Sequence, residues 1–285
     1  MQLRCLPENL LYCRDQLLDL SRPQVMGILN VTPDSFFDGG QYTQLEYALQ
    51  HARQMVEQGA AIIDIGGEST RPNATTVSVE AEIQRVVPVV AAIQKELNVI
   101  ISIDTSSPDV IQEAVKAGAH IWNDVRALSR PNALQMAAHL KIPVILMHGR
   151  GEPGTMNALA NYANIVHEVI SELELRVNAA LAAGVQREQL ILDPGFGFAK
   201  NAQHNLTLLN GLYEFNDYFG LPWLSGLSRK RFLGEVLDGA APGERLFAGL
   251  AGHLISVQQG ASIVRTHDVL ATVQHLKLWQ AALSA

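Results

Sequence analysis

Short apolar runs that end abruptly in polar and turn-forming residues recur along the chain. The first is Val25–Leu29, which leads directly into the polar stretch Asn30–Gly40, with its proline and glycines. An apolar run of this kind, bounded by residues that favour turns, is typical of a buried strand that ends in an ordered loop. The pattern returns in seven later segments: Ile62–Pro72, Ile101–Pro108, Ile121–Val125, Pro143–Gly149, Leu190–Phe198, Pro222–Lys230 and Ser262–Asp268. It predicts eight strands with polar residues at their C-terminal ends.

Between the predicted strands, apolar residues recur at the spacing of one helical face. Ser107 and Pro108 are typical of a helix start, and Gly118 is typical of a helix end. The other predicted helices span Leu45–Gln58, Val79–Leu97, Asn132–Leu140, Tyr162–Ala183, Gln203–Tyr213, Arg229–Leu237, Glu244–Gln258 and Asp268–Leu283.

Strand and helix alternate eight times, which favours parallel strands because each helix returns the chain to the start of the next strand. The length fits an α/β fold of the (β/α)8 TIM-barrel class, whose active sites lie at the C-terminal ends of the strands. An open doubly wound sheet is the alternative, but no GxGxxG follows the first strand and the polar strand ends are spread over all units. We expect a single domain over residues 1–285, with segment 1–23 as a short N-terminal hairpin or plug.

Composition and charge argue against several classes of protein. The chain has 285 residues, of which 48% are hydrophobic, so it can bury a large core. Its net charge of −7 argues against a general nucleic-acid-binding surface. We expect a cytoplasmic protein with no membrane partner, because the N-terminal segment lacks the apolar stretch of a signal peptide and no stretch approaches a membrane span. Cys5 and Cys13, the two cysteines, are expected to be reduced and structural.

Asp104, Asn123 and Asp193 each stand at the end of a predicted strand. Singly, each is more typical of a helix cap or a loop hydrogen bond. In a barrel they would face one mouth, above apolar side chains such as Met147. Two carboxylates and one amide match the donors and acceptors of a flat, amino-substituted heterocycle. The like charges also predict a raised pKa for one carboxyl, unless a cation lies between them.

Two groups of cations follow later strands. Lys230 lies in the basic run Ser228–Arg231, which elsewhere would be a solvated turn but here opens a helix beside the mouth. Arg265 and His267 are two residues apart on the eighth strand, so their side chains leave the same face. They could bind a diphosphate together, or Arg265 could form a salt bridge at the strand end. The residues alone leave both alternatives open.

The segment Gly66–Pro72 would be an ordinary turn by itself, but beside Asn30–Gly40 it predicts the second of two flaps over the mouth. Asp64, which lies among isoleucines, is expected to be a buried hydrogen-bonding group rather than a catalytic one. No Ser-His-Asp order, cysteine nucleophile or Walker sequence is present. Four histidines show no metal-ligand spacing: His139, His148, His167 and His275.

Eight motifs, in order, resemble the signatures of one enzyme family. They read ILNVTPDSFFDGG, DIGGESTRP, SIDTS, NDVRAL, LMHGRGEPGTM, LDPGFGFAK, GLSRK and VRTHD, and they cover the chain from about Val25 onward. In these motifs the chain resembles the dihydropteroate synthases. The resemblance implies a barrel-fold transferase of folate biosynthesis that joins p-aminobenzoate to 6-hydroxymethyl-7,8-dihydropterin diphosphate. The products would be 7,8-dihydropteroate and pyrophosphate, and the cofactor Mg²⁺.

The resemblance also implies site residues, position by position. The pterin would contact Asp104, Asn123, Met147, Asp193 and Lys230. The diphosphate would contact Asn30, Thr70, Arg265 and His267, and Asn30 would also be the metal contact. The p-aminobenzoate pocket would contain Thr70, Arg71, Pro72, Phe198 and Arg231. Lys230, Arg265, His267 and Asp104 would carry the catalysis, with Arg265 and His267 stabilising the charge of the leaving group.

Two other functions stay open. A pterin-binding methyltransferase module would share the ring contacts but would not need the GESTRP loop or the Arg265–His267 pair. A catalytically inactive barrel would serve as a scaffold, although the polar residues at every strand end argue against it.

We also expect a homodimer, because the helices Glu244–Gln258 and Asp268–Leu283 are apolar on more than one face. The apolar residues that suggest this seam are Leu250, Leu254, Ile255, Val257, Val273, Leu276 and Trp279.

Overall fold

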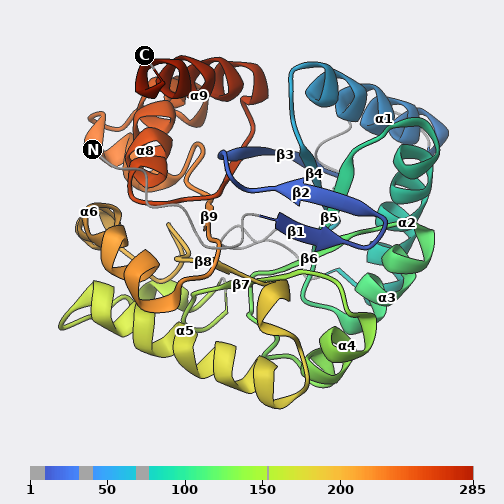
Figure 1. Ribbon diagram of the computed structural model, residues 1–285, viewed down its shortest axis with the longest axis horizontal. Helices are drawn as coiled ribbons and strands as arrows, with labels where there is room; N and C mark the ends of the chain where they lie inside the picture. Colours follow the sequence, from blue (N-terminus) through green and yellow to red (C-terminus); the bar gives the residue numbers. More distant parts are fainter. Residues whose placement is uncertain (1–9, 32–40, 69–76, 153, 285) are drawn as a thin grey trace.

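The computed structural model describes residues 10–31, 41–68, 77–152 and 154–284. Its strands are β1 (Leu10–Cys13), β2 (Gln16–Asp19), β3 (Gln24–Asn30), β4 (Ile62–Gly66), β5 (Ile100–Asp104), β6 (Ile121–Asp124), β7 (Val144–Met147), β8 (Leu190–Asp193), β9 (Leu224–Ser225) and β10 (Ile263–Thr266). Eight of them form a parallel sheet in the order β8-β7-β6-β5-β4-β3-β10-β9. A further bridge joins Leu192 in β8 to Trp223, just before β9, and closes the ring (Figure 1). The predicted barrel is confirmed, and the open doubly wound sheet is not observed.

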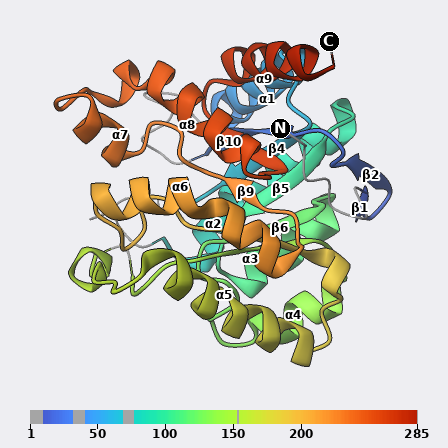
Figure 2. The ribbon, with the colours of Figure 1, turned by 60° about the vertical axis from the view of Figure 1, so that its left-hand side comes forward.

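Helices surround this ring on the outside (Figures 1 and 2). They are α1 (Gln41–Glu57), α2 (Val79–Glu96), α3 (Pro108–Ala117), α4 (Ala133–Leu140), α5 (Ile165–Ala182), α6 (Ala202–Phe219), α7 (Arg231–Val236), α8 (Leu246–Gln258) and α9 (Val269–Leu283). The predicted helices are confirmed, although their ends shift. The largest shift is in α6, which continues six residues beyond its predicted end because Phe215 and Phe219 are buried against the core.

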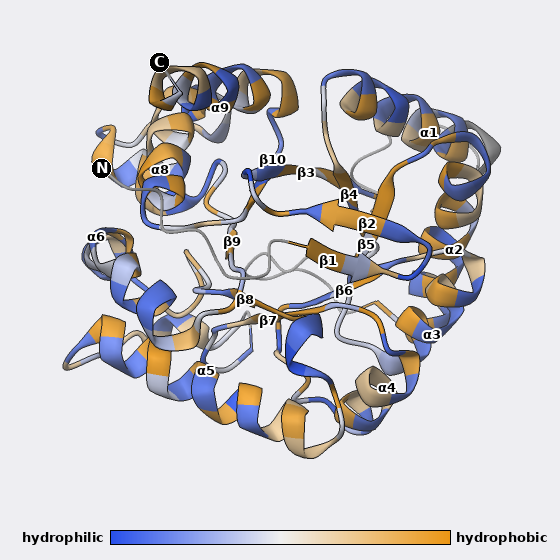
Figure 3. Cartoon of the chain, viewed as in Figure 1, coloured by the Kyte–Doolittle hydropathy of each residue, from blue (hydrophilic) through white to orange (hydrophobic). Residues whose placement is uncertain are grey.

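Two hydrophobic layers hold the barrel together. Outward-facing strand residues such as Ile63 and Ile101 form one cluster with the inner faces of the helices, including Val90 and Ile93 of α2. Figure 3 shows this two-sidedness as helices that alternate between hydrophobic and hydrophilic residues. The helices therefore bury one face each and leave the other to solvent.

The second layer lies inside the barrel, at the N-terminal ends of the strands. Its strand residues are Met26, Ile62, Ile100, Ile121, Ile145, Ile191, Leu224 and Ile263. The antiparallel hairpin β1–β2 adds Leu11, Cys13, Leu18 and Leu20 to the same cluster. Arg14 ties the hairpin to the barrel, since its Nη1 donates to the carbonyl oxygens of Val115 and Ala119, each at 2.9 Å. The predicted N-terminal hairpin thus plugs one end of the core (Figure 2).

Two residues further along several strands, the inward-facing side chains become polar. Asp64 follows Ile62, Asn123 follows Ile121, and Asp193 follows Ile191. Because side chains alternate along a strand, positions two apart point into the same interior. The barrel therefore has an apolar, plugged end and a polar end, and the polar end is at the C-terminal edge of the sheet. Within the described residues, none of the helices is both long enough and apolar enough to span a membrane.

The hairpin packing predicts different costs for two neighbouring substitutions. Leu11 is 2% exposed and Tyr12 is 72% exposed. We expect Leu11→Ala to lower the free energy of unfolding by about 2–4 kcal/mol, because it leaves a cavity in the plug. Tyr12→Ala should change the free energy of unfolding by less than about 0.5 kcal/mol. Urea unfolding followed by circular dichroism measures both, and equal costs would show that the hairpin does not plug the barrel.

Candidate active site

The polar end of the barrel is organised around a buried arginine. Arg265, on β10, lies between two carboxylates: its Nε is 2.6 Å from Asp64 Oδ2 and its Nη2 is 2.7 Å from Asp104 Oδ2. Asp64 is fully buried and also accepts hydrogen bonds from Ser102 Oγ at 2.6 Å and Asn123 Nδ2 at 3.1 Å. The salt bridge that was one of the two alternatives for Arg265 is therefore present. Together with the hydrogen bond from Asn123 to Asp64, it joins residues from four strands.

The hydrogen-bonding role expected for Asp64 is confirmed, but sequence reasoning missed what this residue organises. Its carboxylate holds both the guanidinium of Arg265 and the amide of Asn123. The signal was available in the alternation of β4, because Asp64 stands two residues after the inward-facing Ile62 and pairs in register with Ser102 of β5.

A second part of the rim consists of Asp193, Lys230 and Phe198. Asp193 is buried at the end of β8, where its Oδ1 accepts a hydrogen bond from the backbone N–H of Gly195 at 2.7 Å. The Nζ of Lys230 lies 4.1 Å from the centroid of the Phe198 ring, a cation–π contact. Met147 is 4% exposed and pairs in register with Asp193, so an apolar side chain borders the carboxylate.

These charged groups change one another's pKa values. Burial raises the pKa of Asp104 to about 7, although the Arg265 guanidinium opposes the shift. Burial also raises the pKa of Asp193, against the favourable backbone hydrogen bond from Gly195 and the charge of Lys230. The predicted raised carboxyl pKa therefore occurs even with a cation between the carboxylates.

The two cations shift in opposite directions. Burial lowers the pKa of Lys230 to about 8, and the charge of Arg265 adds to that effect. Burial by itself would lower the pKa of Arg265, but the carboxylates of Asp64 and Asp104 outweigh it and raise the pKa above its ordinary value. Lys230 and Arg265 each lie close enough to act on the charges of both Asp104 and Asp193, so the four groups share one site.

His267 lies just beyond β10, next to this group. Its Nδ1 is 3.1 Å from Ser228 Oγ, and the same hydroxyl accepts a hydrogen bond from the His267 backbone N–H at 3.2 Å. Burial, and after it the positive charge of Arg265, lower the pKa of His267 to about 4. The imidazole is therefore neutral near neutral pH.

The remaining predicted residues fall into three groups. Asn30 ends β3, is half-buried, and pairs in register with Gly66. Arg231 begins α7, with a side chain that is 85% exposed and forms an ion pair with Glu235 at 2.9 Å. Thr70, Arg71 and Pro72 lie outside the described residues, as do most of both predicted flaps. The structure thus brings together Asp104, Asn123, Met147, Asp193, Phe198, Lys230, Arg265 and His267 at one rim.

Comparison with known proteins agrees with this geometry. The model of the family described as pterin binding enzyme matches residues 26–267. The dihydropteroate synthase of Haemophilus influenzae is 51% identical over 275 residues, which cover 96% of this chain and 99% of that protein. The dihydropteroate synthase of Escherichia coli strain K12 is also 51% identical, over 96% of this chain and 97% of its own length.

Solved structures give the same result. The Xanthomonas albilineans dihydropteroate synthase with 4-aminobenzoic acid superposes with a TM-score of 0.91 at 45% identity, covering 97% of this chain and 99% of that one. The same enzyme in complex with 7,8-dihydropteroate gives a TM-score of 0.88 at 42% identity, with the same coverage of 97% and 99%. With its fold and nearly its whole length shared with these proteins, the chain belongs to the pterin-binding enzymes and, within them, to the dihydropteroate synthases.

Proposed function

We propose that the polar rim joins p-aminobenzoate to 6-hydroxymethyl-7,8-dihydropterin diphosphate, releasing pyrophosphate and giving 7,8-dihydropteroate for folate biosynthesis. One observation carries the proposal: two carboxylates, an amide, an ammonium and a guanidinium from separate strands and loops share one rim. That set offers donors and acceptors for a flat heterocycle and positive charge for a diphosphate.

The pterin ring would be held by Asp104, Asn123, Asp193 and Lys230, with Met147 against its face. Carboxylates accept from ring N–H and amino groups, and the amide of Asn123 can both donate and accept. Asp104 titrates near pH 7 and can therefore also donate when it is protonated. The pair Asp64–Arg265 keeps Asn123 and Asp104 in place before the ring arrives.

The diphosphate would be bound by Arg265 and His267. Nε and Nη2 of Arg265 are engaged by carboxylates, but no described residue accepts a hydrogen bond from Nη1, which leaves it available to a phosphate oxygen. The neutral His267 would donate a hydrogen bond rather than a charge. These two groups would stabilise the charge that develops as pyrophosphate leaves, and the reaction needs no enzyme nucleophile.

For the second substrate we propose a pocket next to the Phe198 ring. The ammonium of Lys230 already lies over that ring, so an aromatic acid bound there would sit beside a positive charge. The further contacts proposed for p-aminobenzoate are Thr70, Arg71, Pro72 and Arg231.

The residues present fit a magnesium ion that is bound mainly through the substrate. Among residues 10–31, 41–68, 77–152 and 154–284, no group of three or more His, Cys, Asp or Glu side chains could hold a metal. Asn30 offers one carboxamide oxygen at the rim, and Mg²⁺ commonly takes one or two protein oxygens together with substrate phosphates and water. When bound, the ion would neutralise charge on the leaving diphosphate.

We place the protein in the cytoplasm, as the buried, free thiol of Cys13 suits a reducing compartment.

We also propose a homodimer through α8 and α9, but on residues that differ from part of the sequence prediction. Val257, Val273 and Leu276 pack into the core instead of facing outward. Large apolar side chains do remain exposed on these helices: Phe247 at 80%, Ile255 at 40%, Leu270 at 48% and Leu278 at 74%. An apolar surface of this kind is typical of a contact between subunits.

The reaction itself separates the three candidate functions. Purified protein incubated with the pterin diphosphate, p-aminobenzoate and Mg²⁺ should release pyrophosphate and form dihydropteroate in equal amounts. A methyltransferase module or an inactive scaffold would bind the pterin or nothing, and would release no pyrophosphate above the background rate. Either result would reject the proposal.

Arg265→Ala tests the leaving-group role. We expect kcat to fall by about 10²–10³-fold, because a preorganised charge that meets the developing pyrophosphate is lost. The matched control is Arg53→Ala, which removes an exposed ion pair with Glu96 and should leave kcat unchanged. A steady-state pyrophosphate assay measures both variants, and near-normal turnover of Arg265→Ala would contradict the role.

Phe247→Asp tests the subunit contact. In sedimentation velocity the unmodified chain should run as a dimer and this variant as a monomer, because an aspartate in an apolar contact stays unpaired. Leu175→Asp is the control, since Leu175 is 68% exposed on α5, away from the proposed contact. The proposed surface would be ruled out if the unmodified chain were a monomer, or if the Phe247→Asp variant remained a dimer.

A further inference from the structure

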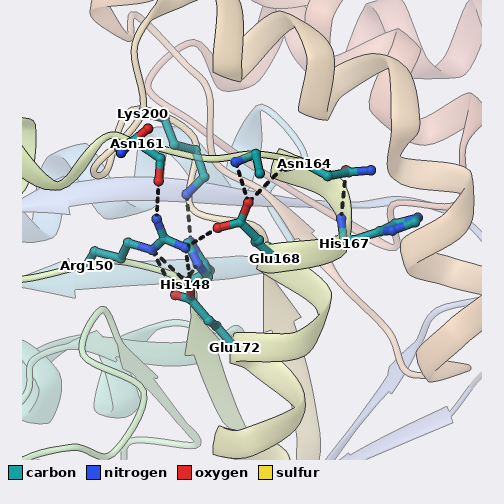
Figure 4. Close-up of polar contacts among 9 residues, drawn as sticks. His148, Arg150, Asn161, Asn164, His167, Glu168, Glu172 and Lys200 are labelled. Atoms are coloured by element: carbon teal, nitrogen blue, oxygen red, sulfur yellow. Dashed lines mark hydrogen bonds and ion pairs between the residues drawn. The ribbon is translucent and has the colours of Figure 1, made fainter.

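Lys200, His148 and Glu172 form a second polar cluster (Figure 4), and Lys200 binds the loop that carries Phe198 of the rim. The Nζ of Lys200 is 2.8 Å from His148 Nδ1, and the Nε2 of the same imidazole is 3.0 Å from Glu172 Oε2. Arg150 also donates to Glu172 from its Nε, at 2.9 Å. Sequence reasoning gave no role to His148, and the proposed reaction uses none of these residues.

The contacts of Lys200 define its charge state. Besides His148 Nδ1, its Nζ donates to the carbonyl oxygens of Gly195 at 3.0 Å and Phe198 at 3.1 Å. An ammonium has three hydrogens, so the charged form satisfies all three acceptors, whereas a neutral amine would turn a lone pair toward one of them. The imidazole that accepts at Nδ1 carries its proton on Nε2 and donates it to Glu172.

Burying this ammonium is costly. Lys200 is 6% exposed, and burial lowers its pKa to about 7. Among the described residues, no carboxylate lies within 4.0 Å of its Nζ. An apolar side chain would fill the space without that cost, so the lysine must be explained by what it holds.

Lys200 binds a loop of unusual backbone conformation, in which only Ala199 is strained. Gly195, Gly197 and Ala199 all have positive φ, of 69°, 77° and 49°. A Cβ at Gly195 would lie 1.8 Å from the carbonyl oxygen of His148, so no other residue fits there. The two carbonyls that Lys200 binds belong to this same loop: that of Gly195 also accepts a hydrogen bond from the Phe198 backbone N–H at 3.1 Å, and the ammonium adds a second bond there and one to the Phe198 carbonyl.

The loop, residues 194–199, carries the pterin-side contacts of the rim. The N–H of Gly195 fixes the Asp193 carboxylate, and the Phe198 ring lies under the Lys230 ammonium. A Cβ at Gly197 would lie 3.1 Å from Lys230 Cδ, so loop and lysine pack closely. Any shift of the loop would therefore move both charged groups proposed to bind the ring.

We propose that Lys200, held by His148 and Glu172, is a positioning residue for pterin binding: it fixes the 194–199 loop and thereby places Asp193, Phe198 and Lys230. Its three hydrogens are all used within the protein, so it does not touch the substrate. This inference rests on the proposed function, since it assigns a purpose to the loop only if the ring binds at the rim.

Lys200→Met is the direct test, because it keeps the length of the side chain and removes the three donors. We expect the Kd for the pterin diphosphate, measured by calorimetry, and its KM to rise by about tenfold or more, with kcat changed by less than about threefold. We expect KM to rise more than kcat falls, because the loop contacts hold the ring equally before and during the reaction, whereas Arg265 and His267, which would stabilise the leaving group, lie outside the loop. Lys141→Met is the matched control, an exposed lysine at the end of α4, and should match the unmodified chain.

A general loss of stability must be separated from misplacement of the loop. Val177→Ala, which removes buried volume from α5 at a position outside the cluster, should lower Tm but leave the pterin Kd unchanged. If Lys200→Met does not fold, Glu172→Leu takes its place. Glu172 is partly exposed, and its loss leaves the His148 imidazole without its partner. We expect the KM for the pterin diphosphate to rise in this variant too, but by less.

The possible failures are distinct. An unmodified chain that releases no pyrophosphate would reject the proposed function. An active chain whose folded Lys200→Met or Glu172→Leu variant keeps the original pterin Kd and KM would overturn the role of Lys200 alone. A rise of pterin Kd in Val177→Ala equal to that in Lys200→Met would do the same.

Discussion

The rim depends on one arginine, Arg265, whose charge is balanced by the fully buried Asp64 and the partly buried Asp104. A guanidinium inside a barrel is costly unless it is paired and its donors are satisfied, and Asp64 and Asp104 supply both conditions. Because Asp64 also binds Ser102 and Asn123, the same interaction orients the neighbouring strands. Because Arg265 binds both carboxylates and Asp64 binds two further side chains, the arrangement acts as one unit rather than as separate contacts.

The position of this unit follows from how the barrel is filled. Its N-terminal half is packed with aliphatic side chains and sealed by the β1–β2 hairpin, so no ligand can enter from that end. The polar layer begins two residues later on several strands and faces the opposite end. The division of one interior into an apolar half for stability and a polar half for chemistry is what the TIM-barrel architecture allows.

Much of this arrangement could be predicted from sequence, because periodicity reports which side of an element is buried. The strand ends that carry Asp104, Asn123, Asp193 and Arg265 followed directly from apolar runs of strand length and from the closure of the ring. The end of α6 did not, since Asn216 and Asp217 favour other conformations and only the packing of Phe215 and Phe219 extends the helix.

The partners of Asp64 and of Lys200 could not be predicted, for another physical reason. Both depend on contacts between residues far apart in the chain, such as Arg265 with Asp64 and Lys200 with His148. A sequence pattern shows that a residue is buried but not which partner neutralises it. The clusters also show that the rim is supported from two sides, by the carboxylates inside the barrel and by the loop after β8.

The central claim is that all of these groups serve one bound ring and its phosphates. A crystal structure of the chain with a dihydropterin and pyrophosphate tests it most directly. We expect the ring to lie within hydrogen-bonding distance of Asn123, Asp193 and Lys230, and the pyrophosphate to contact Arg265 and His267. A ring bound in another cavity, or pyrophosphate bound away from Arg265, would contradict it.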